Sequence, residues 1–72
     1  MIKKQNKNNN FWIVQKQENG QTLQDYLAAK LNVSKRVAKQ QIDAKVVRIN
    51  GQLVWMARHK VRSNDNVSLA TV

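Results

Sequence analysis

The sequence predicts a small single domain of the α/β class, more narrowly α+β, and three observations support this prediction. Two segments whose apolar residues have helical spacing follow one another in the middle of the chain. Short β-prone runs flank these segments, and an Asn-Gly dipeptide separates two of the runs. The chain has 72 residues and no proline, so it can form one modest hydrophobic core. The expected order is strand, helix, helix, hairpin, basic connection and strand.

The first strand is expected to follow a polar leader. Residues 1–10 combine Asn, Gln and three Lys with almost no apolar side chain, which predicts a disordered basic tail and a domain over residues 11–72. The run Phe11–Val14 is β-prone and is bounded by polar residues, so we predict a strand there. Asn19-Gly20 then predicts a turn.

The first helix is predicted over residues 22–31. Thr22 precedes Asp25 by three residues, a pattern typical of a helix N-terminus in which the hydroxyl caps a backbone amide. At roughly 100° per residue, one face of this helix is apolar. That face carries Leu23, Tyr26, Leu27 and Leu31. We therefore expect this face to pack in the core and to have no separate functional role.

The second helix is predicted to begin at the N-cap residue Ser34 and to end near Ala44. Its apolar side consists of Val37, Ala38, Ile42 and Ala44. Its opposite side consists of Arg36, Lys39, Gln40 and Asp43, with Lys35 at the edge. We expect the apolar side to pack against the rest of the domain and the basic side to face solvent.

The remaining strands follow the second helix. Residues 47–49 alternate between apolar and basic, and the Asn-Gly pair at 50–51 is the dipeptide that best suits the two positive-φ positions of a type I′ turn. Residues 52–55 then form the returning strand of a hairpin. The segment 58–62 is basic around a single valine, and residues 67–72 alternate as a closing strand.

The residue types that carry most enzyme chemistry are scarce. The chain has no cysteine and only one histidine, His59, so it offers no zinc-ligand set, and we expect no metal and no cofactor. The four Asp and Glu residues are far apart in sequence, and there is no nucleophile elbow or Gly-rich phosphate loop. We therefore expect no catalytic residues and no enzyme activity from this chain alone.

Membrane insertion is not expected either. The longest apolar runs have four or five residues, far fewer than the roughly 20 that a membrane-spanning helix needs. The polar N-terminus also lacks the apolar segment of a signal peptide. We therefore expect a cytoplasmic protein with no membrane partner.

Positive charge is the most informative property of the chain. Thirteen Lys and Arg residues against four Asp and Glu give a net charge of +9, which favours a polyanionic partner. Between residues 34 and 62 there are eight cations and one acid, Asp43. If the hairpin folds back beside the second helix, these cations converge on one surface that can bind phosphates. They are Lys35, Arg36, Lys39, Lys45, Arg48, Arg58, Lys60 and Arg62.

Other interpretations of this charge predict different behaviour. Binding to an anionic membrane would require bulky apolar groups opposite the lysines of the second helix, where the chain has only Val, Ala and Ile. A helix-turn-helix that reads duplex DNA would leave the arginines of the hairpin unexplained. A solvated basic surface, and a module that docks its cations on an acidic protein, stay open as alternatives.

Four segments of the sequence together resemble the S4 RNA-binding domain. They are TLQDYLAAKL, NVSKRVAKQQI, VVRING and VRSNDNVSL, and they extend from about Thr22 to Leu69. Their joint spacing carries the resemblance. It implies an αL-type, S4-like fold in which two helices pack against a small, mostly antiparallel sheet. It also implies that RNA is bound by the second helix with the adjoining loop and hairpin.

The resemblance assigns RNA contacts to particular positions. The expected contacts are Lys35, Arg36 and Lys39 on the helix, followed by Lys45 and Arg48. Local charge alone adds Arg58, Lys60 and Arg62 to this set.

The chain departs from the usual S4 pattern at several positions. Thr22 replaces the usual Arg before the first Leu, and Lys35 stands between Ser34 and Arg36. Lys45 stands where most members have Gly; if this position is left-handed, Lys costs on the order of 1 kcal/mol relative to Gly. Asn64 replaces the Gly of the last turn, a mild change because Asn tolerates positive φ.

The strand FWIV followed by ENGQTLQDYLA is most similar to the entrance of the N-terminal S4 module of large-subunit-type ribosomal RNA pseudouridine synthases. In those proteins a catalytic domain with its own essential Asp follows. The expected function is therefore a non-catalytic module that binds structured RNA, with ribosomal RNA as the first candidate and transfer RNA as the alternative. Two settings stay open: a targeting module with a catalytic domain on its C-terminal side, or a free-standing S4 protein that binds ribosomes.

Overall fold

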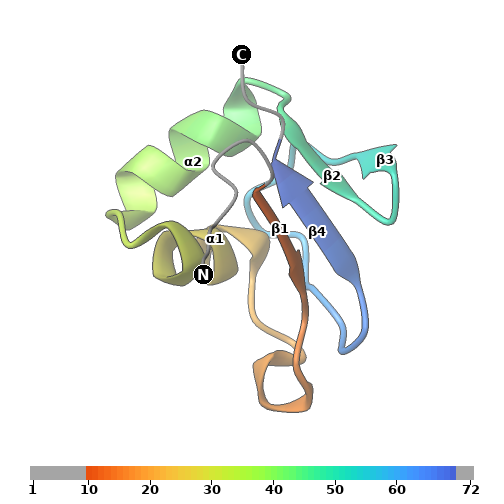
Figure 1. Ribbon diagram of the computed structural model, residues 1–72. Helices are drawn as coiled ribbons and strands as arrows, with labels where there is room; N and C mark the ends of the chain where they lie inside the picture. The colour runs from red at the N-terminus through yellow and green to blue at the C-terminus, as the bar shows by residue number, and fades with distance from the viewer. Residues whose placement is uncertain (1–9, 70–72) are drawn as a thin grey trace, which may run out of the picture.

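The computed structural model describes residues 10–69, and two sequence predictions extend beyond this range. Residues 1–9 of the tail predicted at residues 1–10, and the last three residues of the predicted closing strand, lie outside the described residues. The elements are β1 (Asn10–Ile13), the 3₁₀ turn η1 (Lys16–Glu18), α1 (Leu23–Leu31), α2 (Lys35–Asp43), β2 (Val47–Ile49), β3 (Gln52–Leu53) and β4 (Asn66–Leu69). Their order along the chain is the expected one, with η1 added and β1 beginning at Asn10, one residue early (Figure 1).

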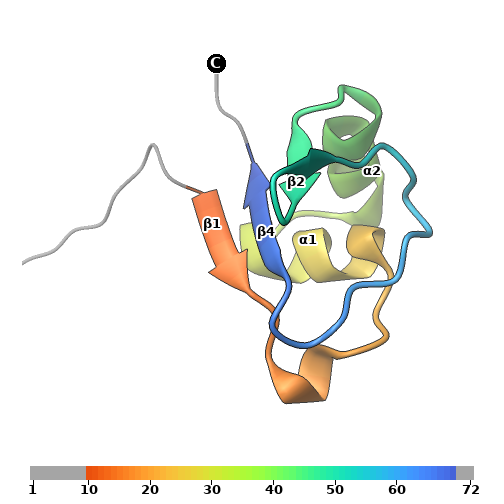
Figure 2. The same ribbon diagram turned by 90° about the vertical axis from the view of Figure 1, so that its right-hand side faces the viewer.

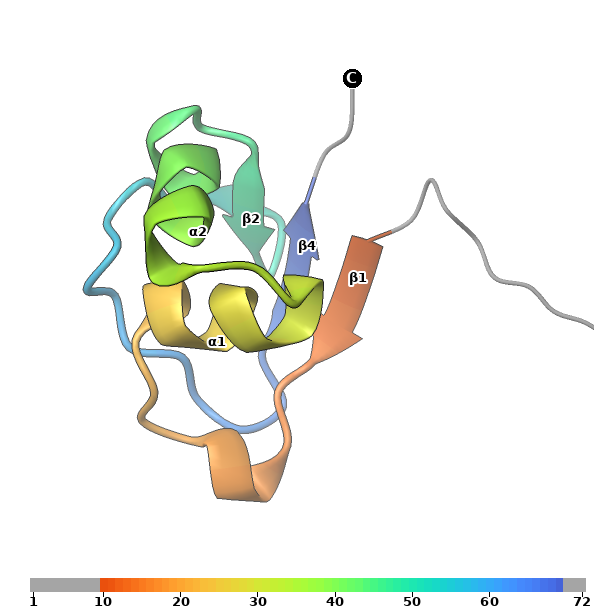
Figure 3. The same ribbon diagram turned by 90° about the vertical axis from the view of Figure 1, so that its left-hand side faces the viewer.

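The strands form one four-stranded sheet in the order β1-β4-β2-β3. In this order β4 lies between β1 and the β2–β3 hairpin. Every neighbouring pair is antiparallel. Both helices lie on one face of this sheet, in front of it in Figure 3. Seen from the opposite side, β1, β4 and β2 lie in front of the helices (Figure 2). The predicted class, two helices packed against a small antiparallel sheet, is confirmed.

The register of the sheet decides which strand residues face the helices. Val47 and Ile49 are buried on the helix side, where they pair across β4 with Leu69 and Val67. Arg48 lies between them and faces the other side of the sheet. Phe11 and Ile13 of β1 lie on that same outer side, and their side chains are 52% and 42% exposed. The core therefore fills only the space between the sheet and the helices.

Helix α1 begins as the sequence predicts. The hydroxyl of Thr22 accepts a hydrogen bond from the backbone N–H of Asp25 at 3.2 Å, which satisfies one of the free amides at the helix start. Three residues of the predicted apolar face, Leu23, Tyr26 and Leu27, are fully buried, whereas Leu31 is partly buried at the helix end. Asn32 ends the helix in the left-handed conformation with φ of 58°.

Helix α2 also has its predicted cap, but its buried face is narrower than expected. The hydroxyl of Ser34 accepts a hydrogen bond from the N–H of Val37 at 3.2 Å. Ala38 and Ile42 are fully buried, whereas Val37 is 36% exposed and Ala44 is exposed, so the prediction that all four pack was wrong. The reason is that a helix of nine residues contacts the core along one i, i+4 line, and Ala44 lies beyond its last turn.

The hairpin turn is confirmed, and the returning strand is shorter than predicted. Asn50 and Gly51 have φ of 53° and 83°, both positive as a type I′ turn requires. Strand β3 ends at Leu53, two residues before the predicted end at Trp55. The N–H of Val54 still donates to the carbonyl of Val47 at 3.0 Å, but Val47 is the first residue of β2. Beyond this point β2 offers no further pairing, and the chain leaves the sheet.

Candidate nucleic-acid interface

Three of the predicted cations lie on α2, and all three are exposed. The ammonium of Lys35 is 3.2 Å from a carboxylate oxygen of Asp25, and that of Lys39 is 3.0 Å from a carboxylate oxygen of Asp43. Exposed pairs of this kind stabilise a protein by at most about 1 kcal/mol, so a phosphate can replace the carboxylate at small cost. No ion pair among residues 10–69 includes Arg36. Arg36 is therefore the cation of α2 that is most available to an anion.

Lys45 lies where α2 leads into β2, and its backbone is left-handed with φ of 63°. The N–H of Lys45 donates to the carbonyl of Ile42 at 3.0 Å, which closes the last turn of the helix. Glycine adopts this conformation without steric strain, whereas a residue with a Cβ costs on the order of 1 kcal/mol. The exposed ammonium of Lys45 is thus held at the helix end by a strained backbone position.

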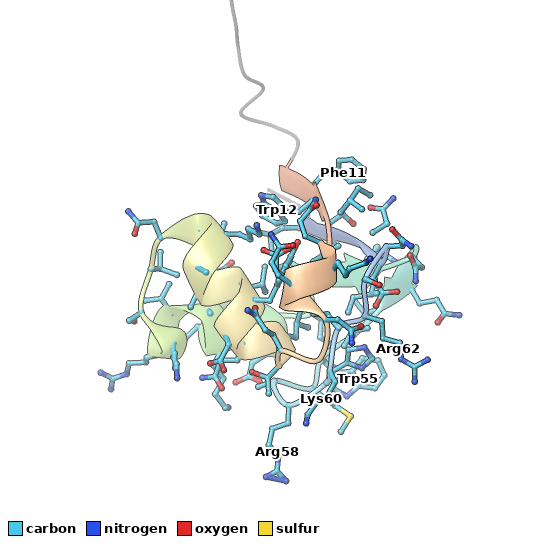
Figure 4. All side chains as sticks on the ribbon, turned by 90° about the horizontal axis from the view of Figure 1, so that it is seen from below. Phe11, Trp12, Trp55, Arg58, Lys60 and Arg62 are labelled. Atoms are coloured by element: carbon cyan, nitrogen blue, oxygen red, sulfur yellow. The ribbon has the colours of Figure 1, made fainter. Side chains whose placement is uncertain are left out.

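Arg58, Lys60 and Arg62 are exposed on the segment 54–65, which connects the hairpin to β4 (Figure 4). We call these three residues the loop cations. Val61 between them is fully buried and anchors the segment in the core. Because Lys60 and Arg62 flank a buried residue in an extended stretch, their side chains face away from the core.

The segment that carries the loop cations is fixed to the residues before and within α1 by backbone hydrogen bonds. The N–H of Leu23 donates to the carbonyl of His59 at 2.6 Å, and Thr22 forms a β-bridge with Lys60. The N–H of Val61 donates to the carbonyl of Gln21 at 2.9 Å. The loop cations are therefore presented by an ordered backbone, which lowers the entropy cost of binding.

Gln24 joins the loop to the start of α2. Its backbone N–H donates to the carbonyl of Ala57 at 3.1 Å, and its side-chain amide donates to the carbonyl of Lys35 at 3.0 Å. The first turn of α1 thus lies between Arg58 on one side and the first turn of α2 on the other. In Figure 3, α2 (green) lies above α1 and the loop (light blue) runs beside it.

Lys60 and Arg62 also line a polar hollow of about 270 Å³ between the hairpin and the loop. Asn50, Gln52 and His59 contribute to the same wall. The side chains of Asn50 and Asp65 stabilise this arrangement, because the amide of Asn50 donates to the carboxylate of Asp65 at 3.1 Å. The same carboxylate accepts from the backbone N–H of Arg62 at 2.9 Å. The hollow therefore has fixed walls and a cationic rim.

Arg48 does not share a surface with the cations of α2. Its neighbours Val47 and Ile49 face the helices, so its side chain lies on the outer side of the sheet, where a guanidinium nitrogen is 3.5 Å from the carbonyl oxygen of Gly51. The cations were expected to converge on one surface if the hairpin folded beside the second helix. The hairpin instead extends the sheet at its edge, so the cations are divided between its two sides.

One exposed group beside the loop cations was not predicted from the sequence. Trp55 was predicted to end the returning strand and Met56 was given no role, but their side chains are 55% and 63% exposed. The signal was present in the sequence as an aromatic residue three positions before the basic segment 58–62. Such mixing of aromatic and basic residues is typical of surfaces that bind single-stranded nucleic acid.

The groups with perturbed titration lie at the core and at η1. Burial raises the pKa of Tyr26 to about 12, and the negative charge of Glu18 adds to this effect. The Tyr26 hydroxyl is buried without a hydrogen-bond partner among the described residues. Within residues 10–69 we find no group of three or more His, Cys, Asp or Glu that could hold a metal ion. In the same range no helix has the length and apolarity to cross a bilayer.

Comparison with known protein families identifies a family with this sequence pattern. The family model of the S4 domain matches residues 21–67, which include both helices, the hairpin and the loop cations. No individual curated protein matches the chain significantly. The S4 domain is a general RNA-binding module, and alone it is non-catalytic. Since the match covers most of the chain and agrees with the helices-on-sheet fold, the protein belongs to the S4 domain family.

Proposed function

We propose that this domain binds structured RNA, with ribosomal RNA as the ligand and transfer RNA as the alternative, by contacting phosphates with α2 and the loop cations. One observation carries the proposal: exposed cations from two separate segments flank the first turn of α1. They are Arg36 on one side and Arg58 and Lys60 on the other, and none of them is in an ion pair among residues 10–69. Gln24 holds the two segments together.

The chemistry of this surface suits a folded RNA. The major groove of an A-form helix is deep and narrow, so side chains recognise its phosphates and shape more than its base sequence. Arginine guanidinium groups form two parallel hydrogen bonds with a phosphate and are always charged. We therefore expect binding that depends on RNA structure, with modest sequence specificity, and that weakens as salt rises because bound counterions are released.

Two biological settings follow from this proposal. The domain would target a pseudouridine synthase to its RNA substrate when a catalytic domain is attached, or it would act alone as a ribosome-associated protein. We propose a cytoplasmic location in both settings. The resemblance of the entrance strand and first helix to the S4 modules of those synthases supports the first setting.

An acidic protein partner is a second candidate, and one observation favours it. The ammonium groups of Lys35 and Lys39 already form ion pairs with the carboxylates of Asp25 and Asp43, so the cations of α2 can bind acidic side chains. Affinity capture from a lysate, with and without nuclease, separates the candidates. A partner that is retained after RNA digestion would favour the protein interface, whereas one that is lost with the RNA would favour RNA binding.

The RNA proposal is tested by titrating the domain against a ribosomal RNA stem-loop at low and at moderate salt. Arg36→Glu and Arg58→Glu should each weaken binding about tenfold, because one charge-assisted hydrogen bond contributes roughly 1.5 kcal/mol. Lys16→Glu is the matched control, since Lys16 is exposed on η1 and the substitution changes the charge equally.

The control substitution should leave the affinity within about twofold of the wild type. Affinity that does not change with salt, or that falls equally for Lys16→Glu and Arg36→Glu, would exclude a localised phosphate contact. Thermal unfolding of each variant verifies that it is folded, which we expect because the three side chains are exposed.

A further inference from the structure

An apolar hollow lies directly beside the polar hollow that Lys60 and Arg62 line. Its volume is about 180 Å³, and its walls include Trp55, Met56 and Leu53. Trp55 and Met56 are more than half exposed, so the hollow opens to solvent beside a large flat ring. Trp55 is one of only four aromatic residues in the chain, and it does not serve the core. A grouped apolar surface of this kind is a candidate binding site.

The apolar and polar hollows form one continuous surface. Val54 and His59 line both of them, so the wall of Trp55 passes without interruption into the rim of Lys60 and Arg62. Figure 4 shows Trp55, Lys60 and Arg62 projecting on the same side of the domain. One half of this surface is therefore flat and apolar. The other half carries the cations Lys60 and Arg62, and the Asp65 carboxylate in its wall is bonded to the Asn50 amide and the Arg62 backbone N–H.

The backbone that carries this surface is ordered at both ends. The N–H of His59 donates to the carbonyl of Met56 at 3.1 Å, which closes a turn directly after Trp55. The N–H of Val54 continues the β2–β3 pairing, and the carbonyl of His59 is bound by the first amide of α1. The backbone that carries the ring is thus ordered before any ligand arrives, which reduces the entropy lost on binding.

We propose that this surface binds an unpaired nucleotide of RNA, with its base stacked on the indole of Trp55 and its phosphate contacting Lys60 and Arg62. A nucleotide is complementary to this surface, because its flat base matches the apolar half and its anionic phosphate matches the cations of the other half. Stacking on an aromatic side chain accepts any base, so the site would recognise an exposed nucleotide by its structure. The inference rests on the proposed RNA-binding function and narrows its ligand to stems that carry a bulged or looped-out nucleotide.

Three RNAs test this site with the full chain: an uninterrupted stem, the same stem with one bulged nucleotide, and the same bulge with an abasic residue. The wild type should bind the bulged stem on the order of 5- to 150-fold more tightly than the uninterrupted stem, the range that one base stacked on an aromatic ring provides. The abasic bulge keeps the phosphate but removes the base, so it should lose this preference.

Substitutions of Trp55 separate stacking from simple apolar contact. Trp55→Leu keeps apolar area but removes the flat ring, so it should abolish the preference and leave affinity for the uninterrupted stem within twofold. Trp55→Phe keeps a ring and should retain part of the preference. Quenching of tryptophan fluorescence by the bulged stem should be present in the wild type and lost in Trp55→Phe.

The outcomes distinguish this site from the underlying function. Equal affinity for the bulged and abasic RNAs, or an unchanged preference in Trp55→Leu, would overturn the nucleotide site while salt-dependent binding to the stem still supports the phosphate contacts. If no RNA binds in a salt-dependent way and Arg36→Glu has no effect, the proposed function and the nucleotide site both fail. Trp55 is largely exposed, so its variants should melt at nearly the wild-type temperature.

Discussion

Lys45 is the residue at which local backbone strain and positive charge coincide. Its φ of 63° is left-handed, and its N–H donates to the carbonyl of Ile42 in the last turn of α2. The other residues at positive φ are Asn or Gly, which adopt such conformations more readily. A lysine at this position is therefore locally unfavourable, and it follows directly after α2, whose exposed face is basic.

Lys45→Gly should raise the free energy of unfolding by about 1 kcal/mol, because glycine has no Cβ to clash in the left-handed region. Chemical denaturation measures this change. Lys45→Ala is the matched control, since it removes the same charge but keeps the Cβ, and it should give no comparable gain. If Ala stabilises the domain as much as Gly does, charge repulsion rather than backbone strain is the cause.

Residues whose role depends only on nearby positions in the sequence were predictable. Thr22 and Ser34 cap the helices as expected because a cap depends on residues within one turn. The Asn50-Gly51 turn was predictable for the same reason. The exposure of Val37 was not predictable, because it depends on how α2 is tilted against α1 and the sheet. The helical periodicity of the sequence does not determine this tilt.

At the scale of elements, η1 is attached to α1 through one carboxylate. One oxygen of Glu18 accepts from the backbone N–H of Gln15 at 2.7 Å, and the other is 2.7 Å from the ammonium of Lys30. That ammonium also lies 5.3 Å from the centre of the Tyr26 ring, within the range of a cation–π contact. The hydrogen bond from Lys30, followed by that from Gln15, holds the pKa of Glu18 below its ordinary value of 4.5.

This pKa shift predicts a pH dependence of stability. Because the folded pKa of Glu18 is lower than the unfolded value, its contribution is complete above about pH 4.5 and is lost as the pH falls through the folded pKa. Glu18→Gln should therefore lower the unfolding free energy by about 1 kcal/mol at pH 7. The difference from the wild type should shrink at pH 3, as measured by urea denaturation at both values.

Asp43→Asn is the control for the Glu18 substitution, because it breaks an exposed ion pair within α2 and leaves η1 unchanged. It should alter stability by less than about 0.5 kcal/mol. A constant difference between Glu18→Gln and the wild type from pH 7 to pH 3 would show that the Glu18 charge is not the stabilising feature.

The elements that sequence analysis missed depend on partners far away in the chain. The turn η1 has no apolar periodicity, and it is held by Lys30 twelve positions after its last residue. Strand β3 stops early because its partner β2 starts at Val47, and not because residues 54 and 55 disfavour a strand. The helices were predictable because their apolar residues repeat at a local spacing. The position of η1 and the end of β3 have no such local repeat.

At the scale of the whole molecule, the sheet separates the positive charge into two groups. The cations of α2 and the loop cations flank α1, whereas Arg48 lies on the outer side of the sheet with Phe11 and Ile13. The class of the fold followed from the order of its elements, and the family model agrees with it. The distribution of charge over the two sides of the sheet could not be predicted from the sequence. It depends on the hairpin extending the sheet edge, a topology that the pattern of charges does not reveal.

This separation predicts that the cations contribute unequally to the salt dependence of RNA binding. Each phosphate contact adds nearly one unit to the slope of log K against log salt concentration. Arg36→Ala should therefore reduce the slope by about one unit, whereas Arg48→Ala should leave it nearly unchanged, because Arg48 lies across the sheet from α2. Binding constants over a series of salt concentrations measure both slopes with one stem-loop. An equal reduction by the two substitutions would mean that the RNA extends around the hairpin edge and contacts both sides of the sheet, and the interface would then include the outer face with Phe11.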